Sequence, residues 1–292
     1  MRVLVTGASG QLGVALQRFA PPDIEVVALG REALDITNRA AVGAALKQNA
    51  DALINAAAYT DVEGAERAPA EAFRINSEGA AILAANCAAN RIRLVHVSTD
   101  FVFDGAKGTP YEPSDEAQPL NVYGASKLEG ERRVLEILAN ACIVRTSWVH
   151  SADRANFVTK MVRRMRSGAS LHVVADEVGA PTSVHSLAPV LWQCAMQSAR
   201  GIHHWSDAGS TNRFEYARAI GGFAREYALL AELPPILPAQ TADFPSGAKR
   251  PRYSVLATEA TQAALGIRAR SWIEGLQLTM RDLQRQDQEQ RQ

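Results

Sequence analysis

Short apolar runs alternate along this chain with longer stretches in which apolar residues recur every three or four positions. The short runs predict strands at 3–5, 24–29, 52–54, 92–97, 142–144, 171–174 and 201–205. The longer stretches predict helices at 12–20, 38–48, 62–90 with a break at Pro69, 121–139, 157–167, 184–198, 213–226 and 272–283. Strands that alternate with helices indicate a parallel sheet covered on both faces. The pattern therefore predicts a doubly wound α/β fold of Rossmann type, with ligands at the carboxyl ends of its strands.

This alternation weakens after Trp148. We therefore expect residues 1–148 to form mainly a Rossmann domain. Residues 149–283 are expected partly to complete its sheet and partly to build a smaller C-terminal cap that binds the substrate. Residues 284–292 are polar and repetitive, which predicts a frayed tail.

The composition is that of an ordinary globular protein of 292 residues, with 47% apolar and 21% charged residues. Lys and Arg (31) balance Asp and Glu (31), so the net charge gives no support to a nucleic-acid partner. Cys87, Cys142 and Cys194 lie far apart in apolar contexts, which indicates reduced core residues rather than a disulfide framework. With no leader-like segment before the first strand and no apolar run of membrane-spanning length, we expect a cytoplasmic protein without a membrane partner.

The first strand leads into a glycine-rich turn. Gly7, Gly10 and Gly13 follow it at three-residue spacing, with Gln11 and Leu12 where the first helix begins. Gly7 permits the sharp turn, Gly10 lacks the Cβ that would block a pyrophosphate, and Gly13 lets helix and strand approach closely. The N–H groups at the helix start supply donors for an anion. This strand–turn–helix unit predicts a dinucleotide site.

The end of the second strand indicates which dinucleotide binds. An NAD site usually places Asp or Glu about twenty residues beyond the glycine turn, where it binds the ribose 2′-hydroxyl. Here Gly30 and Arg31 follow the strand, and no acid occurs before Glu32. An uncharged residue and a cation suit a 2′-phosphate. We therefore predict NADPH as the preferred cofactor of residues 1–148, with NADH tolerated as a weaker substitute.

Tyr123 and Lys127 are the residues best suited to acid–base chemistry. Four positions apart on a helix, they share a face, and a nearby ammonium lowers the pKa of a tyrosine from about 10 toward neutrality. Such a tyrosine can give or take a proton, although a solvated helix face is the alternative interpretation of the pair. The polar sequence Ser98-Thr99-Asp100 ends the fourth strand, and the Thr99 hydroxyl can bond a substrate carbonyl there. A role as a cap or turn residue suits Ser98 or Asp100 better than Thr99.

Together these motifs resemble the extended short-chain dehydrogenase/reductase superfamily. The matching residues are the glycines of the first turn, Thr99, the Tyr123-x-x-x-Lys127 pair and Asn76-x-x-Gly79. Longer stretches are similar to one family within it, the dTDP-4-dehydrorhamnose reductases. They are NAAAYT at 55–60, STDFVFDG at 98–105, PLNVYG at 119–124, RTSWV at 145–149, GAPT at 179–182, and Arg250-Pro251 with Ser254 and Leu256. The resemblance runs from Met1 to about Leu283.

The resemblance implies an oxidoreductase of dTDP-rhamnose biosynthesis. NADPH would deliver hydride to C4 of dTDP-4-dehydro-β-L-rhamnose to give dTDP-L-rhamnose. Tyr123 would protonate the C4 oxygen, Lys127 would lower the Tyr123 pKa and bind the nicotinamide ribose, and Thr99 would polarise the carbonyl. Asp100 and Trp148 match positions that contact the sugar nucleotide, so the resemblance implies substrate binding for both.

The resemblance also implies further contacts with both ligands. The matched positions near the cofactor are Asp35 and Ile36, which flank the adenine, and Ala57, Ala58 and Tyr59 after the third strand. Arg250 is the expected cation for the substrate diphosphate, because it belongs to a matched motif. The alternatives are Lys249 and a cationic helix face with Lys160, Arg163 and Arg164, for which a solvated surface is the preferred interpretation.

No metal site is predicted. Some members of the family hold a divalent ion at a dimer contact through a carboxylate in the first helix, but residues 11–20 contain no acid. A Mg²⁺-bridged dimer is therefore not expected. His203 and His204 are adjacent on a predicted strand and face opposite ways, which is poor geometry for shared ligation. Monomer and homodimer both stay open.

Two alternative functions remain. One is another sugar-nucleotide reductase or a 4-epimerase of the same superfamily, which would retain tightly bound NAD. The other is a non-catalytic NADP-binding regulatory subunit that keeps the fold. The Gly30-Arg31 pair and the Trp148 motif argue against the epimerase, and the intact Thr99, Tyr123 and Lys127 favour catalysis.

Overall fold

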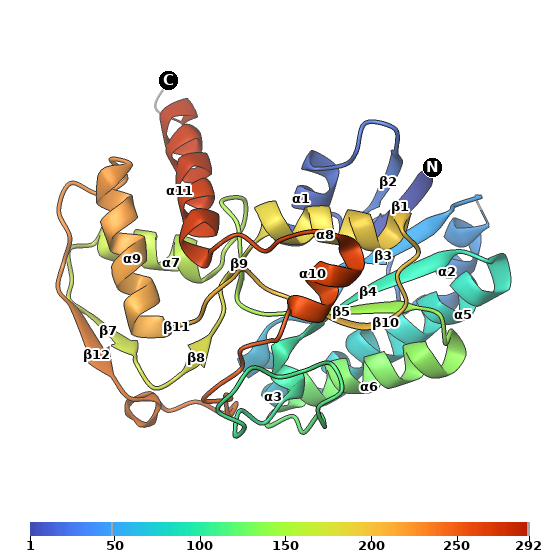
Figure 1. The fold of residues 1–292 in the computed structure, drawn as a ribbon, viewed down its shortest axis with the longest axis horizontal. Coiled ribbons are helices and arrows are strands. Elements are labelled where there is room, and N and C mark those ends of the chain that lie inside the picture. Colours follow the sequence, from blue (N-terminus) through green and yellow to red (C-terminus); the bar gives the residue numbers. More distant parts are fainter. Residues whose placement is uncertain (48, 291–292) are drawn as a thin grey trace.

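Six parallel strands form the central sheet of the molecule (Figure 1). The computed structural model describes residues 1–47 and 49–290. The strands are β1 (Arg2–Thr6), β2 (Glu25–Leu29), β3 (Ala52–Asn55), β4 (Arg93–Thr99), β5 (Cys142–Thr146) and β10 (Gly201–Trp205). They lie in the order β10-β5-β4-β3-β1-β2, and every neighbouring pair is parallel. The doubly wound α/β fold predicted from the sequence is confirmed.

The strand order itself positions a ligand site. The chain runs outward from β1 to β2 and then returns to place β3 on the other side of β1. At such a switch point the connections leave in opposite directions, which opens a crevice beyond the carboxyl ends of the two strands. The glycine turn after β1 and the residues after β3 and β4 all lie at this edge.

Alternate residues of the strands supply two separate hydrophobic cores. Val3 and Val5 pack with helices α1 (Gln11–Arg18) and α8 (Val184–Met196), whereas Leu4 belongs to the core on the opposite face. The helices of that opposite face are α2 (Arg39–Leu46), α5 (Ala80–Asn90) and α6 (Val122–Ile137). Because both faces are covered, the strands consist of nearly continuous apolar runs.

The long helical stretch predicted at 62–90 is divided. Its parts are α3 (Val62–Arg67), α4 (Pro69–Phe73), a π-helical turn (Arg74–Gly79) and α5. The break at Pro69 is confirmed, and this proline occupies the first turn of α4, where its missing N–H costs nothing. The wider π turn buries the side chain of Asn76, which contacts Ser126 of α6.

A second group of elements forms a cap beside the sheet, on the left of Figure 1. Its helices are α7 (Phe157–Met165), α9 (Arg213–Glu226) and α11 (Trp272–Glu289), and its paired strands are β7 (Leu171–Val174) and β12 (Ile236–Ala239). Its core surrounds the buried Tyr216, which stacks on Phe157 and meets Trp272 edge-on, each at 5.6 Å between ring centroids.

Short two-residue pairings join the cap to the sheet region. They are β6 (Val149–His150) with β9 (Thr182–Ser183), and β8 (Val178–Gly179) with β11 (Thr211–Asn212). The sequence pattern did not indicate these strands, β12, or helix α10 (Glu259–Leu265). The two-residue strands are too short to carry readable periodicity, and Pro238 interrupts the apolar run of β12.

The C-terminal tail differs from the expectation. Helix α11 continues to Glu289, so the prediction of a frayed tail from residue 284 is wrong over that range, and residues 291–292 lie outside the described part. Polar contacts hold this part of the helix. Gln284 donates to the carbonyl of Tyr227 at 3.0 Å, and Arg166 pairs with Asp287 at 2.8 Å. Composition alone cannot reveal such tertiary partners. Residue 48, the predicted end of the second helix, also lies outside the described part, and α2 ends at Leu46.

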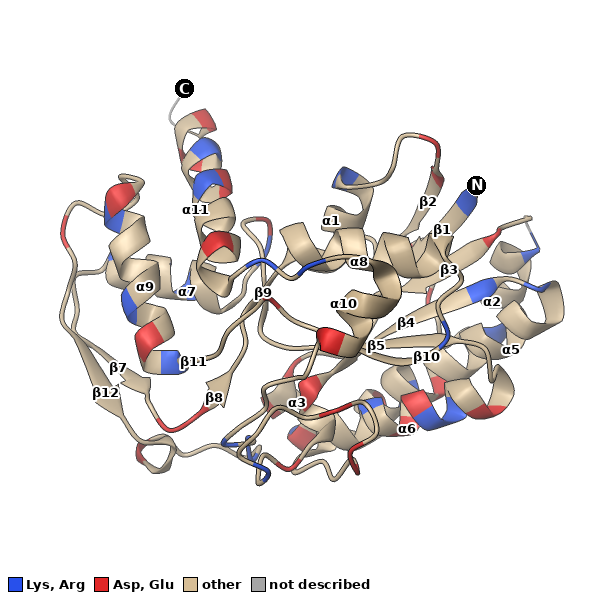
Figure 2. Cartoon of the chain, viewed as in Figure 1, with Lys and Arg blue, Asp and Glu red and all other residues tan. Residues whose placement is uncertain are grey.

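Charged residues of both signs lie on α6, α9 and α11 (Figure 2). All three cysteines are buried with free thiols. Within residues 1–47 and 49–290, no helix combines the length and apolar character needed to span a membrane.

Candidate active site

The glycine turn after β1 has the geometry that the sequence predicts. Gly7 adopts a φ of +67°, and a Cβ there would lie 2.6 Å from the backbone N of Ala57. A Cβ on Gly13 would lie 2.2 Å from the carbonyl oxygen of Gly7, so only glycine lets α1 begin this close to the strand. Gly10 caps α1 without a side-chain hydrogen bond, and the first turn of the helix contains no acid. The N–H groups at the start of α1 are therefore available to an anion.

One cavity of about 460 Å³, a size typical of small-molecule sites, lies at the carboxyl ends of β1, β3, β4 and β5. The predicted residues that line it are Gly7, Gly10, Gln11, Leu12, Gly13, Arg31, Asp35, Ile36, Ala57, Ala58, Thr99, Asp100, Tyr123, Lys127 and Trp148. Gly30, Tyr59 and Arg250 are not part of this lining, and their ligand contacts stay predictions. The cavity thus unites the glycine turn with the proposed acid–base residues.

Thr99, Tyr123 and Lys127 all line this cavity. Tyr123 and Lys127 lie on the first two turns of α6, whose N-cap is Asn121, and Thr99 is the last residue of β4. The Thr99 hydroxyl donates to Asp100 at 3.1 Å and accepts the N–H of Phe101 at 3.2 Å. Thr99 therefore caps the short 3₁₀ turn Asp100–Val102. The sequence analysis had favoured Ser98 or Asp100 over Thr99 for such a role.

The environment of Tyr123 differs from the expected one. Burial raises the pKa of its phenol to about 12, the hydrogen bond with Thr99 lowers it, and the charge of Asp100 raises it. The expected lowering of this pKa by Lys127 is not among the effects that act on the phenol. The reason is that the phenol lies in a poorly solvated position next to a carboxyl group. Tyr123 is therefore protonated at neutral pH.

The ammonium of Lys127 is almost fully buried, which lowers its pKa to about 8, while Glu131 one turn later raises it. Its Nζ donates to the carbonyl of Val97 at 2.6 Å. It lies 3.5 Å from Nε2 of His96, a buried residue of β4 that the sequence analysis did not single out. Lys127 is thus an amine that can change protonation state near neutral pH.

Asp100 and Trp148 border the same cavity. Burial raises the pKa of Asp100 to about 6, and the Ser254 hydroxyl donates to its carboxyl at 2.6 Å. Trp148 has a φ of +44°, and the guanidinium of Arg213 lies 3.5 Å from its ring centre. A Cβ on Gly179 would meet the indole at 2.5 Å, which explains the glycine of the GAPT motif. The indole is held in place by contacts on more than one side.

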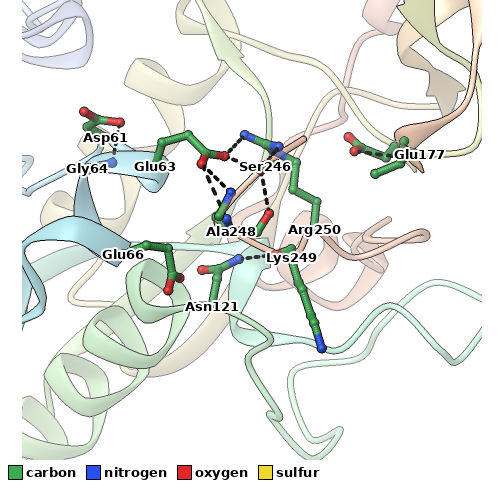
Figure 3. Close-up of polar contacts among 12 residues, drawn as sticks. Asp61, Glu63, Gly64, Glu66, Asn121, Glu177, Ser246, Ala248, Lys249 and Arg250 are labelled. Carbon is green, nitrogen blue, oxygen red and sulfur yellow. Dashed lines mark hydrogen bonds and ion pairs between the residues drawn. The ribbon is translucent and has the colours of Figure 1, made fainter. Parts of the chain in front are cut away.

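Arg250 contacts helix α3 and is not part of the cavity lining (Figure 3). Its guanidinium pairs with Glu63 of α3 at 2.8 Å. Glu63 also accepts from the Ser246 hydroxyl at 2.5 Å and from the N–H of Gly247 at 3.1 Å. The side-chain amide of Asn121 donates to the backbone carbonyl of Lys249 at 2.7 Å. Segment 246–250 is thus a junction between the cap and α3 and α6.

The arginine of the RTSWV motif has a structural role. Arg145 forms a buried ion pair with Glu131 at 2.7 Å, and Ser98 donates to the same carboxylate. His204, on the buried side of β10, lies 3.4 Å from Arg145, whereas His203 faces outward, as the alternation of the strand predicts. Within the described residues no group of three or more His, Cys, Asp or Glu side chains has the arrangement of a metal site.

Two residues in or beside the cavity had no role in the sequence analysis. Arg74 lines the cavity near Asp35 and pairs with Glu71 at 2.7 Å. Asn76 donates to the Ser126 hydroxyl at 2.9 Å and so joins the π turn to α6. Asn76 belongs to the Asn76-x-x-Gly79 match of the resemblance, which gave it no role. Nothing in the sequence indicated a role for Arg74.

The chain is similar to known proteins over nearly its whole length. The family model described as the RmlD substrate binding domain matches residues 1–285. The dTDP-4-dehydrorhamnose reductase of Sinorhizobium fredii is 37% identical over 282 residues, which are 94% of this chain and 95% of that protein. A dTDP-4-dehydrorhamnose reductase structure from Clostridium acetobutylicum has a TM-score of 0.91 and 35% identity, covering 97% of this chain and 100% of that one. The Bacillus anthracis reductase, solved with NADP, has a TM-score of 0.90 and 34% identity, covering 96% and 99%.

Proposed function

The chain belongs to the family described as the RmlD substrate binding domain, and we propose that it reduces dTDP-4-dehydro-β-L-rhamnose to dTDP-L-rhamnose with NADPH. The observation that carries this proposal is the convergence of Thr99, Tyr123 and Lys127 on the cavity that also contains the glycine turn. A cofactor bound along that turn and a sugar bound beside Trp148 would meet at these three side chains.

The residues present fit a dinucleotide phosphate. The open N–H groups at the start of α1 suit the pyrophosphate, and Arg31 and Arg74 line the end of the cavity near Asp35, where the 2′-phosphate would lie. When bound, NADPH supplies the hydride that reduces the C4 carbonyl. The remaining tasks, holding the carbonyl and delivering a proton to its oxygen, belong to the protein.

Tyr123 is suited to deliver that proton. A phenol with a pKa of about 12 is fully protonated at neutral pH, which is the form that a proton donor needs. The Thr99 hydroxyl, in contact with Tyr123, would hold the carbonyl oxygen within reach of the phenol. Asp100 and Trp148 would bind the sugar, since a carboxyl accepts from sugar hydroxyls and an indole packs on the apolar side of the ring.

Arg250 stays our proposed partner of the substrate diphosphate. The Glu63 carboxylate already binds its guanidinium, together with the hydroxyl of Ser246 and two backbone N–H groups. This set of donors suits an anion. A diphosphate at this place would therefore have to share or replace the Glu63 contact.

The test is a turnover assay with purified protein across dTDP-, UDP- and GDP-linked keto sugars, using NADPH and NADH. We expect stoichiometric NADPH oxidation with dTDP-4-dehydro-β-L-rhamnose. We also expect Tyr123→Phe to lower kcat by at least about a hundredfold while NADPH binding, followed by fluorescence, is retained. Wild type and variant that are equally inert would favour the regulatory subunit. Tightly bound nicotinamide without net consumption would favour the epimerase.

Two further expectations accompany this function. We propose a cytoplasmic location, because the substrate and cofactor are free nucleotides, and a monomer or homodimer as the assembly. Size-exclusion chromatography with light scattering distinguishes the two assemblies.

A further inference from the structure

A chain of buried hydrogen bonds lies behind Lys127, on the side away from the cavity. The Thr6 hydroxyl donates to Oδ1 of Asn55 at 2.7 Å, and Nδ2 of Asn55 lies 2.8 Å from Nδ1 of His96. Nε2 of His96 lies 3.5 Å from Nζ of Lys127. The four side chains come from β1, β3, β4 and α6, and each is at most 2% exposed. None of the roles assigned so far uses Thr6, Asn55 or His96.

The backbone fixes the direction of this chain. The N–H of Ala57 donates to Oδ1 of Asn55 at 3.1 Å, and an N–H can only meet an acceptor, so this atom of the amide is its oxygen. The other amide atom, Nδ2, is therefore a donor toward His96. Nδ1 of His96 must accept that hydrogen bond and carries no proton.

His96 is a neutral imidazole, because burial and the nearby Lys127 hold its pKa well below its usual value. A neutral imidazole carries one proton, and with Nδ1 as an acceptor that proton is on Nε2. The Nε2–H group points at Nζ of Lys127. An N–H facing an ammonium is unfavourable, whereas an N–H facing the lone pair of an amine forms a hydrogen bond.

The other groups near Lys127 do not share this preference. The carbonyl of Val97 accepts an N–H from either form of the side chain. Glu131 favours the ammonium, but its carboxylate is already paired with Arg145 and bonded by Ser98. Tyr123, one turn earlier on α6, is neutral. His96 is therefore the neighbour that opposes the charged form through an oriented bond.

We propose that Asn55 holds His96 as the Nε2–H tautomer, and that His96 is a positioning residue that stabilises the neutral amine of Lys127 during turnover. This inference rests on the proposed roles of Tyr123 and Lys127 in carbonyl reduction. It adds two residues, Asn55 and His96, that touch neither substrate nor cofactor in the proposed mechanism.

The amine is the product of one proton-transfer step. When Tyr123 gives its O–H proton to the C4 oxygen, a phenolate remains. An N–H bond of the Lys127 ammonium breaks, the proton restores the Tyr123 phenol, and a neutral amine is left. The lone pair of this amine accepts Nε2–H of His96, and Lys127 regains a proton from solvent. Protons and charge balance without any further reactant.

The decisive measurement is the protonation of Lys127 itself, independent of turnover. Competitive acylation of the ligand-free protein across pH, with the Lys127 peptide quantified by mass spectrometry, gives its pKa. Exposed Lys160 is the internal standard. Wild type is expected to titrate near 8. His96→Asn keeps an acceptor for Asn55 and removes the Nε2–H group, so the Lys127 pKa is expected to rise by about one unit.

Asn55→Asp supplies a second, independent variant. A carboxylate at this position needs a proton on Nδ1 of His96, which moves the lone pair to Nε2 and reverses the bond toward Lys127. The pKa of Lys127 is expected to rise by more than in His96→Asn, because a buried negative charge is added. His150→Asn is the matched control, since His150 is equally buried but bonds Thr279 of α11, and it leaves the Lys127 pKa unchanged.

The kinetic counterpart is a drop in kcat of His96→Asn at pH 7 of about tenfold, with the alkaline limb of the rate profile moved upward and NADPH affinity unchanged. A Lys127 pKa that is the same as in wild type in both variants would overturn the proposal. So would an Nδ1–H tautomer of His96 in ¹⁵N NMR spectra of the wild type, a measurement that needs no variant to fold. A shifted Lys127 pKa in a protein without reductase activity would support the effect of His96 on Lys127. It would overturn only the proposed function.

Discussion

Arg31 and Arg74 bring two guanidinium groups to the end of the cavity near Asp35, but they are not equivalent. Arg74 is bound to Glu71 through both Nε and an Nη atom, each at 2.7 Å, and it also bonds Thr37. Arg31 is exposed. Hydrogen bonds from Thr37 lower the pKa of Asp35 and one from Arg74 lowers that of Glu71, and the charge of Arg31 adds to both effects. The arginine that can turn toward a 2′-phosphate is therefore Arg31.

Replacing this arginine is expected to change cofactor preference. In Arg31→Ala, kcat/KM with NADPH falls about tenfold or more, because a charge-assisted hydrogen bond of about 1.5–3 kcal/mol is lost. The value with NADH stays the same. Matched initial rates with the two cofactors measure this, and Arg39→Ala, at an exposed arginine of α2, is the control. An equal loss with both cofactors would show that Arg31 does not bind the 2′-phosphate.

At this scale, residues in local motifs could be predicted and residues joined only by the fold could not. Gly7, Thr99 and Tyr123 each follow from a spacing within one segment, because the chemistry requires those residue types at the end of a strand or on one helix face. In the sequence, His96 is one residue within the apolar run 92–97, and no local motif marks it. Its contact with Asn55 exists only because β3 and β4 are neighbours in register, and Asn55 pairs with His96.

Among the elements, α6 carries the proposed acid–base pair, and its N-cap residue links it to segment 246–250. The side chain of Asn121 accepts the N–H of Gly124 at 2.8 Å, which caps the helix, and it donates to the carbonyl of Lys249 at 2.7 Å. One amide therefore sets both the start of the helix that holds Tyr123 and the position of segment 246–250 (Figure 3).

The two functions of this amide can be separated by substitution. Asn121→Asp keeps the cap but cannot donate to Lys249, so it is expected to raise the KM for the dTDP-sugar with little effect on stability. Asn121→Ala loses both, and its free energy of unfolding falls by about 1–2 kcal/mol. Urea denaturation and steady-state kinetics measure the two effects.

Asn38→Ala is the matched control for this pair, because Asn38 caps α2 by the same bond, to the N–H of Ala41 at 3.1 Å, on an exposed part of the molecule. It is expected to lose stability and retain KM. A KM for Asn121→Asp equal to that of wild type would contradict the link to the cap.

An element could be predicted when it was long enough and when its own residues, rather than distant partners, stabilise it. Strands β1 to β5 and helices α6 and α8 have enough apolar residues for their period to show. The two-residue strands of the cap and the end of α11 depend on partners distant in sequence, such as Tyr227 for Gln284. Composition identified this end as polar but could not show that α9 and α7 would hold it.

For the whole molecule, buried ionisable groups determine how stability responds to acid. Burial lowers the pKa of His150 and His204 to about 3 and that of His96 well below its usual value, whereas an unfolded histidine titrates near 6.5. Between these values the unfolded chain binds protons that the native protein does not. Stability is therefore lost as the pH falls through 6.5 toward 3.

Two carboxyls act in the opposite direction. Burial raises the pKa of Asp100 to about 6 and that of Asp207 to about 7, so the native protein retains protons that the unfolded chain releases above about 4. Their contribution is complete below that value and is lost as the pH rises through 6 and 7. With three histidines against two carboxyls, we expect a net loss of stability on acidification from pH 6 to pH 4.5.

His150 allows this balance to be tested one proton at a time, because it lies in the short strand β6 and contacts none of the acid–base residues. In His150→Asn the free energy of unfolding, from urea denaturation at pH 4.5 to 6, is expected to depend less steeply on pH than in wild type. One proton fewer per unfolding event changes the slope by about 1.4 kcal/mol per pH unit. His203→Asn, at an outward-facing position of β10, is expected to leave the slope unchanged. Parallel pH dependences of His150→Asn and wild type would show that the native protein takes up a proton at His150, contrary to its burial. The absolute stability of the variant does not enter this comparison, so the cost of the substitution itself cannot imitate the effect.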